Sequence, residues 1–181
     1  FENDALKILK KKKNLRLIDA SNFSLSEVLN FNSANENILV QSEDRKIFTK
    51  KDFKIVSKIK PSKTQFDDLI FAFNICRYVK SNAIVLASKK TTIGIGSGQP
   101  SRLDSCQIAI DKMRKFTKPY ADIVAASDAF FPFIDGIEKL VQSGVKGVIQ
   151  PAGSIRDKEV IKFANETGTT LVFSKTRHFR H

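Results

Sequence analysis

The sequence contains no tryptophan, one methionine, two cysteines and two histidines. With so few thiols and imidazoles, and with neither a C-x-x-C nor an H-x-E spacing, it lacks the ligand pattern of a zinc site. It also lacks the G-x-S-x-G turn of serine hydrolases and the G-K-S/T sequence of phosphate-binding loops. Cys76 and Cys106 fall on predicted helix faces, which indicates small buried side chains in a reducing compartment rather than a disulfide.

Long apolar runs are absent as well. No stretch is long enough to span a bilayer and no signal-peptide pattern opens the chain, so we expect a cytoplasmic protein without membrane contact. Acidic residues are outnumbered, with 19 Asp and Glu against 31 Lys and Arg and a formal net charge of +12. This balance favours anionic partners. Binding of a nucleic acid is less favoured than a basic surface with no such role, because no stacking aromatics are interleaved with the lysine run 10–13.

What the sequence does contain is an alternation of apolar segments. Its 181 residues, 41% of them apolar, suit one domain or a piece of a larger protein. The strand–helix alternation predicts an α/β layer structure with a partly parallel sheet and ligands beyond the carboxyl ends of strands. Strands are predicted over 14–18, 37–41, 54–59, 83–87, 91–95, 123–125, 148–150 and 170–173, and helices over 1–13 and from near Ser62, Ser101, Ile137 and Ser154. The segment 19–36 is expected to be irregular.

The stretch 80–102, KSNAIVLASKKTTIGIGSGQPSR, is the first candidate for chemistry. Three alternating glycines at 94, 96 and 98 would let the backbone approach a ligand closely. Ser101 can cap the following helix, and its free N–H groups together with Arg102 would hold a phosphate or carboxylate. A plain tight turn is an equally good interpretation of this pattern.

Three further stretches could line a site. In SDAFFPFID, residues 127–135, Pro132 forces a turn among phenylalanines, so one ring could face a pocket beside Asp135; three core rings are an equal alternative. PAGS, residues 151–154, could form an anion nest, although a loop ending in a helix cap is the favoured interpretation. The tail 176–181 holds both histidines, and Arg177 and Phe179 could reach a site unless the tail is frayed.

Five motifs in this order, KSNAIV, IGIGSGQPSR, ASDAFFPFIDG, VIQPAGSIRD and RHFRH, resemble the C-terminal half of the AICAR transformylase domain. That domain belongs to the family of bifunctional AICAR transformylase / IMP cyclohydrolase enzymes, and FENDALKILKKKKNLRLI, ILVQSEDRK and FKIVSKIKP upstream are similar too. The resemblance implies a cytidine-deaminase-like layered α/β/α domain with a mixed sheet that has lost the zinc ligands. We expect residues 1–60 to form a connecting segment and 61–181 this subdomain.

The resemblance also implies a reaction, the transfer of a formyl group from 10-formyltetrahydrofolate to AICAR in purine biosynthesis, by a homodimer with a shared active site. The residues that match AICAR contacts are Asn82, Arg102 and Arg177. Those that match folate contacts are Leu103, Phe130, Asp135, Ser154 and Ile155. Those that match a structural potassium site are Ser81 and Asp128.

One departure from the family is a missing dipeptide. The catalytic Lys-His pair of a K-H-x-N-P-C-G-like motif belongs to the preceding half of the domain, and this chain has no Lys-His sequence. The chain, which has no initiator methionine, is therefore expected to be a fragment that binds parts of both ligands without the general base. Two other classes stay open: a basic nucleic-acid-binding α/β module, and an interaction module that serves mainly as a dimer interface.

Overall fold

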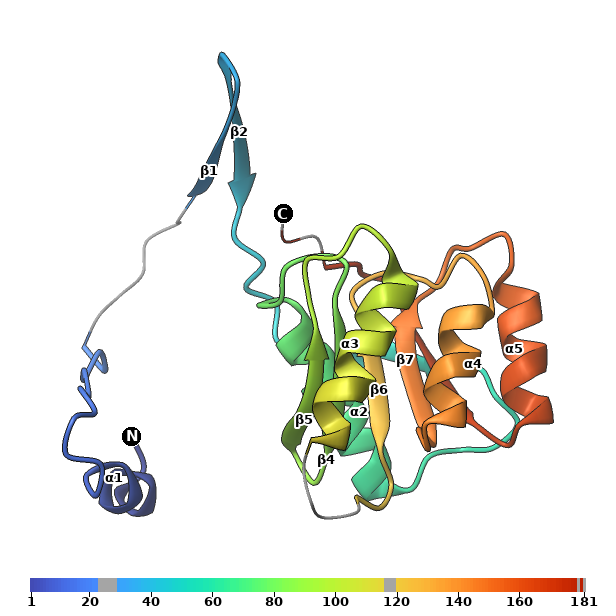
Figure 1. Ribbon diagram of the computed structural model, residues 1–181, viewed down its shortest axis with the longest axis horizontal. Coiled ribbons are helices and arrows are strands. Elements are labelled where there is room, and N and C mark those ends of the chain that lie inside the picture. Colours follow the sequence, from blue (N-terminus) through green and yellow to red (C-terminus); the bar gives the residue numbers. More distant parts are fainter. Residues whose placement is uncertain (23–28, 116–119, 179, 181) are drawn as a thin grey trace. The chain divides into compact units, whose positions relative to one another are not determined.

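The computed structural model describes residues 1–22, 29–115, 120–178 and 180. It divides into two compact units, Phe1–Glu43 and Asp44–His181 (Figure 1). The division into a connecting segment over 1–60 and a subdomain over 61–181 stays a prediction. Residues 44–60 lie with the larger unit because the strand Phe53–Ile55 pairs with the last strand of its sheet.

The smaller unit holds one helix and a hairpin. Helix α1 (Asn3–Leu9) ends before the lysine run, so the predicted helix over 1–13 is too long. Strands β1 (Leu29–Ala34) and β2 (Asn37–Ser42) form an antiparallel pair. The expected strand over 14–18 is wrong, and the expected irregular stretch is a strand over Leu29–Ala34. None of these elements has a buried residue, so the described residues of this unit form no core of their own.

The larger unit is built on one mixed sheet of six strands, in the order β3-β8-β7-β6-β4-β5. Strands β6, β7 and β8 are parallel, whereas β4 runs antiparallel to both β5 and β6, and β3 runs antiparallel to β8. The strands are β3 (Phe53–Ile55), β4 (Ile84–Ser88), β5 (Thr91–Gly96), β6 (Val124–Ser127), β7 (Gly147–Pro151) and β8 (Thr170–Ser174). The predicted strand over 54–59 is therefore shorter than expected.

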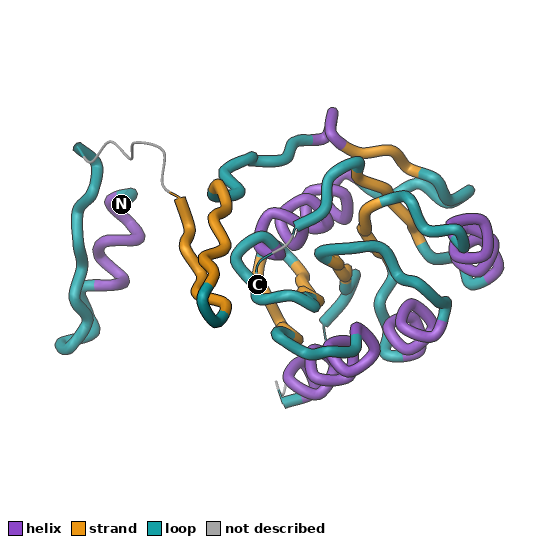
Figure 2. Tube along the Cα trace, turned by 90° about the horizontal axis from the view of Figure 1, so that it is seen from above, coloured by secondary structure: helices purple, strands orange, loops and turns teal. Residues whose placement is uncertain are grey.

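Helices cover both faces of this sheet (Figure 2). The helices are α2 (Lys63–Cys76), α3 (Arg102–Arg114), α4 (Asp135–Gln142) and α5 (Asp157–Glu166), and a short 3-10 turn, η1, spans Lys50–Asp52. Alternate residues of β4 divide between the two faces: Ile84 and Leu86 join the core formed with α3, α4 and α5, and Val85 joins the core formed with α2. This confirms the layered α/β/α architecture with a mixed sheet.

Some helices begin at the predicted cap residue and others do not. The Ser62 hydroxyl accepts from the Gln65 backbone N–H at 3.1 Å, as the sequence predicts. Helix α5 is different, because its cap position is Arg156 and the Ser154 hydroxyl accepts from the Arg156 N–H at 3.1 Å. In the described part of the chain, no helix is both long and apolar enough to cross a membrane.

The strand directions bring the ends of four strands and the start of β4 to one edge of the sheet. The parallel strands β6, β7 and β8 all end there, and so does β5, because Gly96 pairs with Ile84 at the start of β4. Ile84 also pairs with Ser127 at the end of β6. The segment before β4, the start of α3 and the loop after β6 therefore meet at this edge, as expected for a ligand site in an α/β sheet.

Candidate functional site

A pocket of about 540 Å³ lies at this edge. Its walls come from the segment before β4, the start of α3, the loop between β6 and α4, and the tail after β8. It brings together six of the residues predicted to contact ligands: Asn82, Arg102, Leu103, Phe130, Asp135 and Arg177. Four separate chain segments thus supply one cavity.

Arg102 is the centre of a hydrogen-bond network at the pocket. Its Nη1 donates to the Ser127 hydroxyl at 2.9 Å and to the Asp128 carboxylate, and its Nη2 donates to Asn82 Oδ1 at 2.7 Å. The Asp128 side chain is 1% exposed, so this is a buried ion pair. Because the start of α3, the segment before β4 and the end of β6 each supply a partner, the network fixes the three segments relative to one another.

Asn82 is itself held by the backbone. Its Nδ2 donates to the carbonyl oxygens of Gln99 and Pro100 at 2.8 and 3.0 Å, and its own carbonyl accepts from the Ser105 hydroxyl at 2.8 Å. These bonds orient the amide oxygen toward Arg102. The Asn82 side chain is therefore a rigid part of the pocket wall.

Arg177 is the more available cation. Its guanidinium carbon lies 4.9 Å from the centre of the Phe130 ring, in cation–π geometry. No hydrogen bond from this guanidinium to the described residues is found, and the residue is exposed. Its donors are thus free to receive an anion, while Arg102 is already neutralised by Asp128.

The sequence left open whether the three phenylalanines of the loop after β6 lie in the core or face a pocket, and the structure shows some of each. Phe131 is buried in the core, whereas Phe130 is half-buried and Phe133 is 52% exposed. All three border the pocket. The Arg156 guanidinium carbon lies 4.8 Å from the centre of the Phe133 ring, which links this loop to the one after β7.

Asp135 stands at the first turn of α4, where its Oδ1 accepts from the Gly136 N–H at 2.7 Å. The side chain therefore lies beside the N-terminal backbone N–H groups of the helix. Because the residue is exposed at the pocket, the carboxylate can still accept from a ligand N–H group.

Two predicted folate contacts do not line the pocket. Ser154 accepts from Arg156 within its own loop, and its backbone N–H donates to Asp157 Oδ1 at 3.2 Å. Ile155 is fully exposed. Both stay predictions, and the stacking of Arg156 on Phe133 places their loop next to the pocket rim.

Ser81 and Asp128 do lie together, as the potassium prediction requires, with the Ser81 hydroxyl donating to Asp128 Oδ2 at 2.5 Å. The other carboxylate oxygen is held by Arg102, so a cation there would compete with a guanidinium for the same counter-ion. This donor set favours Arg102, and the potassium site stays a prediction. Within the described ranges, no cluster of three or more His, Cys, Asp or Glu is placed to hold a metal.

The glycines of 94–98 have a different role from the one predicted. A Cβ on Gly94 would lie 2.1 Å from the carbonyl oxygen of Ala109, and one on Gly96 would lie 1.8 Å from that of Ser105. These two glycines therefore let α3 pack directly on β5, and close approach of a ligand is not what requires them. The helix cap is as predicted, since the Ser101 hydroxyl accepts from the Asp104 N–H at 3.4 Å.

Two site-related residues escaped the sequence analysis. Ser127 at the end of β6 binds Arg102, and nothing in its local sequence distinguishes it from a strand serine. His178 was expected in a tail that could be frayed, yet it is 1% exposed and bonded to Asp44. Phe179, the other tail residue singled out, lies outside the described residues.

The fold and the pocket define a layered α/β protein with a basic, aromatic-walled cavity at the carboxyl ends of its strands. The family model described as "AICARFT/IMPCHase bienzyme" matches residues 1–112. The chain belongs to this family.

Curated relatives match over the whole chain. Bifunctional purine biosynthesis proteins PurH from Leptospira biflexa and from Chlorobium phaeobacteroides are both 44% identical to it and are covered to 36% and 34% of their length. The protein from Persephonella marina is 43% identical and is covered to 35%. The chain thus spans about a third of the length of these relatives.

Among solved structures, the dCMP deaminase of cyanophage S-TIM5 is similar, with a TM-score of 0.41 and 18% identity over 62% of this chain and 98% of that one.

Proposed function

We propose that this chain supplies part of the ligand-binding pocket of an AICAR formyltransferase, which acts in the cytoplasm on the way to IMP. The observation that carries the proposal is the convergence of six predicted contact residues on one pocket. Membership of the AICARFT/IMPCHase family and 44% identity to purine biosynthesis proteins support the same reaction.

The pocket is lined by two kinds of side chain. Asn82, Arg102 and Arg177 are polar or basic, which suits AICAR, an anionic ribonucleotide with a carboxamide. Leu103, Phe130 and Asp135 are apolar, aromatic and acidic, which suits a pterin ring that stacks and donates N–H groups. Ser154 and Ile155 would extend the folate side from the neighbouring loop.

In the proposed reaction the AICAR amine attacks the formyl carbon of 10-formyltetrahydrofolate. A C–N bond forms to the amine, the bond from the formyl carbon to N10 breaks, and N10 receives a proton as the amine loses one. This chain would hold and orient both reactants. It has no imidazole on the described pocket walls to accept the amine proton, because His178 is buried elsewhere. We propose that the base comes from the part of the relatives' length that this chain does not span, and that the site is shared in a homodimer.

The AICAR side is tested by calorimetric titration of AICAR into the chain. Arg177→Ala should weaken binding by about tenfold or more, because it removes from the pocket a guanidinium that forms no hydrogen bond with the described residues. Arg114→Ala is the matched control, since Arg114 lies at the far end of α3. Equal affinity for wild type and Arg177→Ala would refute this side of the site.

The folate side is tested with folic acid, followed by fluorescence. Asp135→Asn keeps the size of the side chain and removes its charge, so we expect a loss of about tenfold in affinity. The control is Asp111→Asn on the exposed side of α3, whose carboxylate accepts from Gln107. If Asp135→Asn binds folic acid as wild type does, the carboxylate has another role.

The distribution of charge is the observation that favours the alternative function, a basic nucleic-acid-binding module. The smaller unit carries six basic and six acidic residues, whereas the larger carries 25 and 13, so the whole net charge lies in the larger unit. An RNA-binding module would show affinity that falls steeply with salt, because several phosphates would be neutralised together. Micromolar or weaker RNA affinity near physiological salt would exclude it.

A further inference from the structure

His178 is a buried polar residue that the proposed reaction does not use. Its ring lies 4.5 Å from the ring of Phe73 and 5.2 Å from that of Phe48, measured between centroids, and the residue is 1% exposed. Nδ1 lies 2.5 Å from Asp44 Oδ2. Since a carboxylate has only acceptors, the proton of this bond belongs to Nδ1. Nε2 is buried and has no partner among the described residues, so Asp44 is the polar partner that the ring has there.

The position of this residue in the chain links it to the pocket. The His178 backbone N–H donates to the Asp128 carbonyl at 2.9 Å, and Asp128 is the ion-pair partner of Arg102. The preceding residue is Arg177, whose guanidinium stacks on Phe130 at the pocket wall. Two residues further on, the Arg180 carbonyl accepts from the Ser81 N–H at 2.8 Å.

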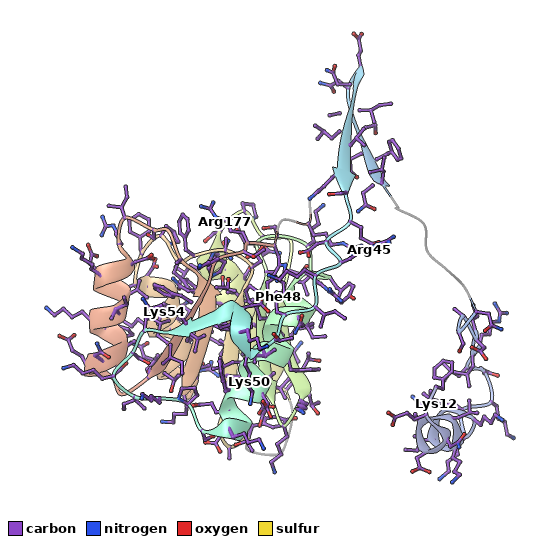
Figure 3. All side chains as sticks on the ribbon, turned by 180° about the vertical axis from the view of Figure 1, so that it is seen from behind. Lys12, Arg45, Phe48, Lys50, Lys54 and Arg177 are labelled. Carbon is purple, nitrogen blue, oxygen red and sulfur yellow. The ribbon has the colours of Figure 1, made fainter. Side chains whose placement is uncertain are left out.

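Arg177 has no polar anchor of its own among the described residues. Its backbone is fixed by what flanks it, and its long side chain would lose several rotamers on binding an anion. A neighbour whose ring is locked into the core therefore reduces the conformations open to Arg177. In Figure 3, Arg177 lies at the loop end of the larger unit and Phe48, which covers His178, lies nearer its middle.

We infer that the Asp44–His178 pair is an anchor that sets Arg177 over Phe130 and into the pocket, so that both are positioning residues for anion binding. This inference rests on the proposed function for its consequence, the binding of AICAR. The anchor itself is a statement about the free chain. Asp44, the first residue of the larger unit, would then couple the start of that unit to its binding site.

The test uses Asp44 because its side chain is 32% exposed, so its replacement should leave the fold intact. In Asp44→Ala the chemical-shift change that the Phe130 ring causes at the Arg177 Nε–H should become smaller. AICAR should also bind about tenfold more weakly. Asp44→Asn keeps an acceptor for His178 Nδ1–H and should retain most of both signals. Asp67→Ala is the matched control, with a 30% exposed carboxylate paired to Lys50 far from the tail.

A double variant separates positioning from general stability. If the anchor acts through Arg177, then Arg177→Ala with Asp44→Ala should bind AICAR no more weakly than Arg177→Ala alone. Additive losses, or an unchanged resonance and affinity in Asp44→Ala, overturn the inference. If wild type itself does not bind AICAR, the proposed function fails, and the Arg177 resonance alone decides whether the anchor exists.

Discussion

Arg102 and Asp128 form a buried ion pair in which one guanidinium joins the start of α3 to the end of β6. Each charge is acceptable inside the protein because the other is present, and Ser127 and Asn82 take two further donor hydrogens. The pair therefore ties the two elements together, and Arg102 also lines the pocket. A ligand contact by Arg102 would use the guanidinium N–H groups that do not donate to Asp128, Ser127 or Asn82.

The first prediction follows from this dual role. Asp128→Ala should lower the free energy of unfolding by about 3 kcal/mol or more, because Arg102 is left as an uncompensated buried charge. Arg102→Ala should cost a similar amount, and the double variant should cost clearly less than the two losses added together. Denaturant unfolding of the four chains gives the coupling. Ser127→Ala, which removes one neutral acceptor, is the control at about 1 kcal/mol, and additive losses would contradict the coupling.

The second prediction concerns the turn between β4 and β5. Asp68 on α2 is buried, and its two carboxylate oxygens accept from the backbone N–H groups of Lys89 and Lys90 at 2.8 and 2.7 Å. Both lysines have positive φ, 51° and 52°, so the carboxylate supports a backbone conformation that is unfavourable for them.

Asp68→Ala should therefore cost about 2 kcal/mol in the free energy of unfolding, since two part-buried backbone N–H groups lose their charged acceptor. Asp67→Ala next to it removes an exposed pair with Lys50 and should cost less than about 1 kcal/mol. Denaturant midpoints measure both. If Asp68→Ala loses no more free energy of unfolding than Asp67→Ala does, the turn keeps its conformation without the Asp68 carboxylate.

Sequence pattern predicts the larger unit well where local signals decide. The strands and helices from Lys63 to Ser174 lie close to their expected positions, because each carries an alternating or helical apolar pattern between turn residues. The caps Ser62 and Ser101 are also as predicted, since each hydroxyl accepts from the backbone N–H three residues later. Six predicted contacts meet in one pocket because the strand directions, which the alternation implies, collect them at one edge.

Features that depend on pairing or packing with another segment were not predictable from local composition. The strand Leu29–Ala34 is rich in Asn and Ser, and it is a strand because it pairs with β2. The burial of His178 depends on Asp44, 134 residues earlier in the chain. The glycines of β5 look like a ligand loop by spacing, and only the packing of α3 against them shows their structural role.

The third prediction tests that packing. Gly96→Ala should cost about 2–3 kcal/mol, because its Cβ would meet the Ser105 carbonyl oxygen at 1.8 Å and α3 would have to move. Since Ser101 and Arg102 lie at the start of α3, AICAR affinity should fall as well. Gly147→Ala is the control, because the atoms nearest to its Cβ belong to flexible side chains, Gln65 at 3.3 Å and Leu69 at 3.6 Å, so it should change stability by less than about 1 kcal/mol. Equal effects of the two substitutions would contradict the close contact.

The fourth prediction concerns the two cysteines, which are buried in opposite cores. Burial raises the pKa of the Cys106 thiol from its ordinary 9.0 to about 12, and burial also raises the pKa of Cys76 well above its usual range. Because the thiolate is the reactive form, neither residue should react with a disulfide reagent at pH 8 until the chain is unfolded. Labelling of the native chain as fast as of the denatured one would refute this.

The same shift fixes a dependence on pH. Between pH 9 and 12 the Cys106 thiol ionises in the unfolded chain but stays protonated in the folded one, so the unfolded state binds fewer protons and is favoured as the pH rises. The contribution of this thiol to stability is complete below pH 9 and is lost through that window. Cys106→Ala should therefore show a smaller fall in the free energy of unfolding between pH 9 and 10.5 than wild type. Identical slopes in denaturant unfolding would mean that the buried thiol ionises as freely as an exposed one.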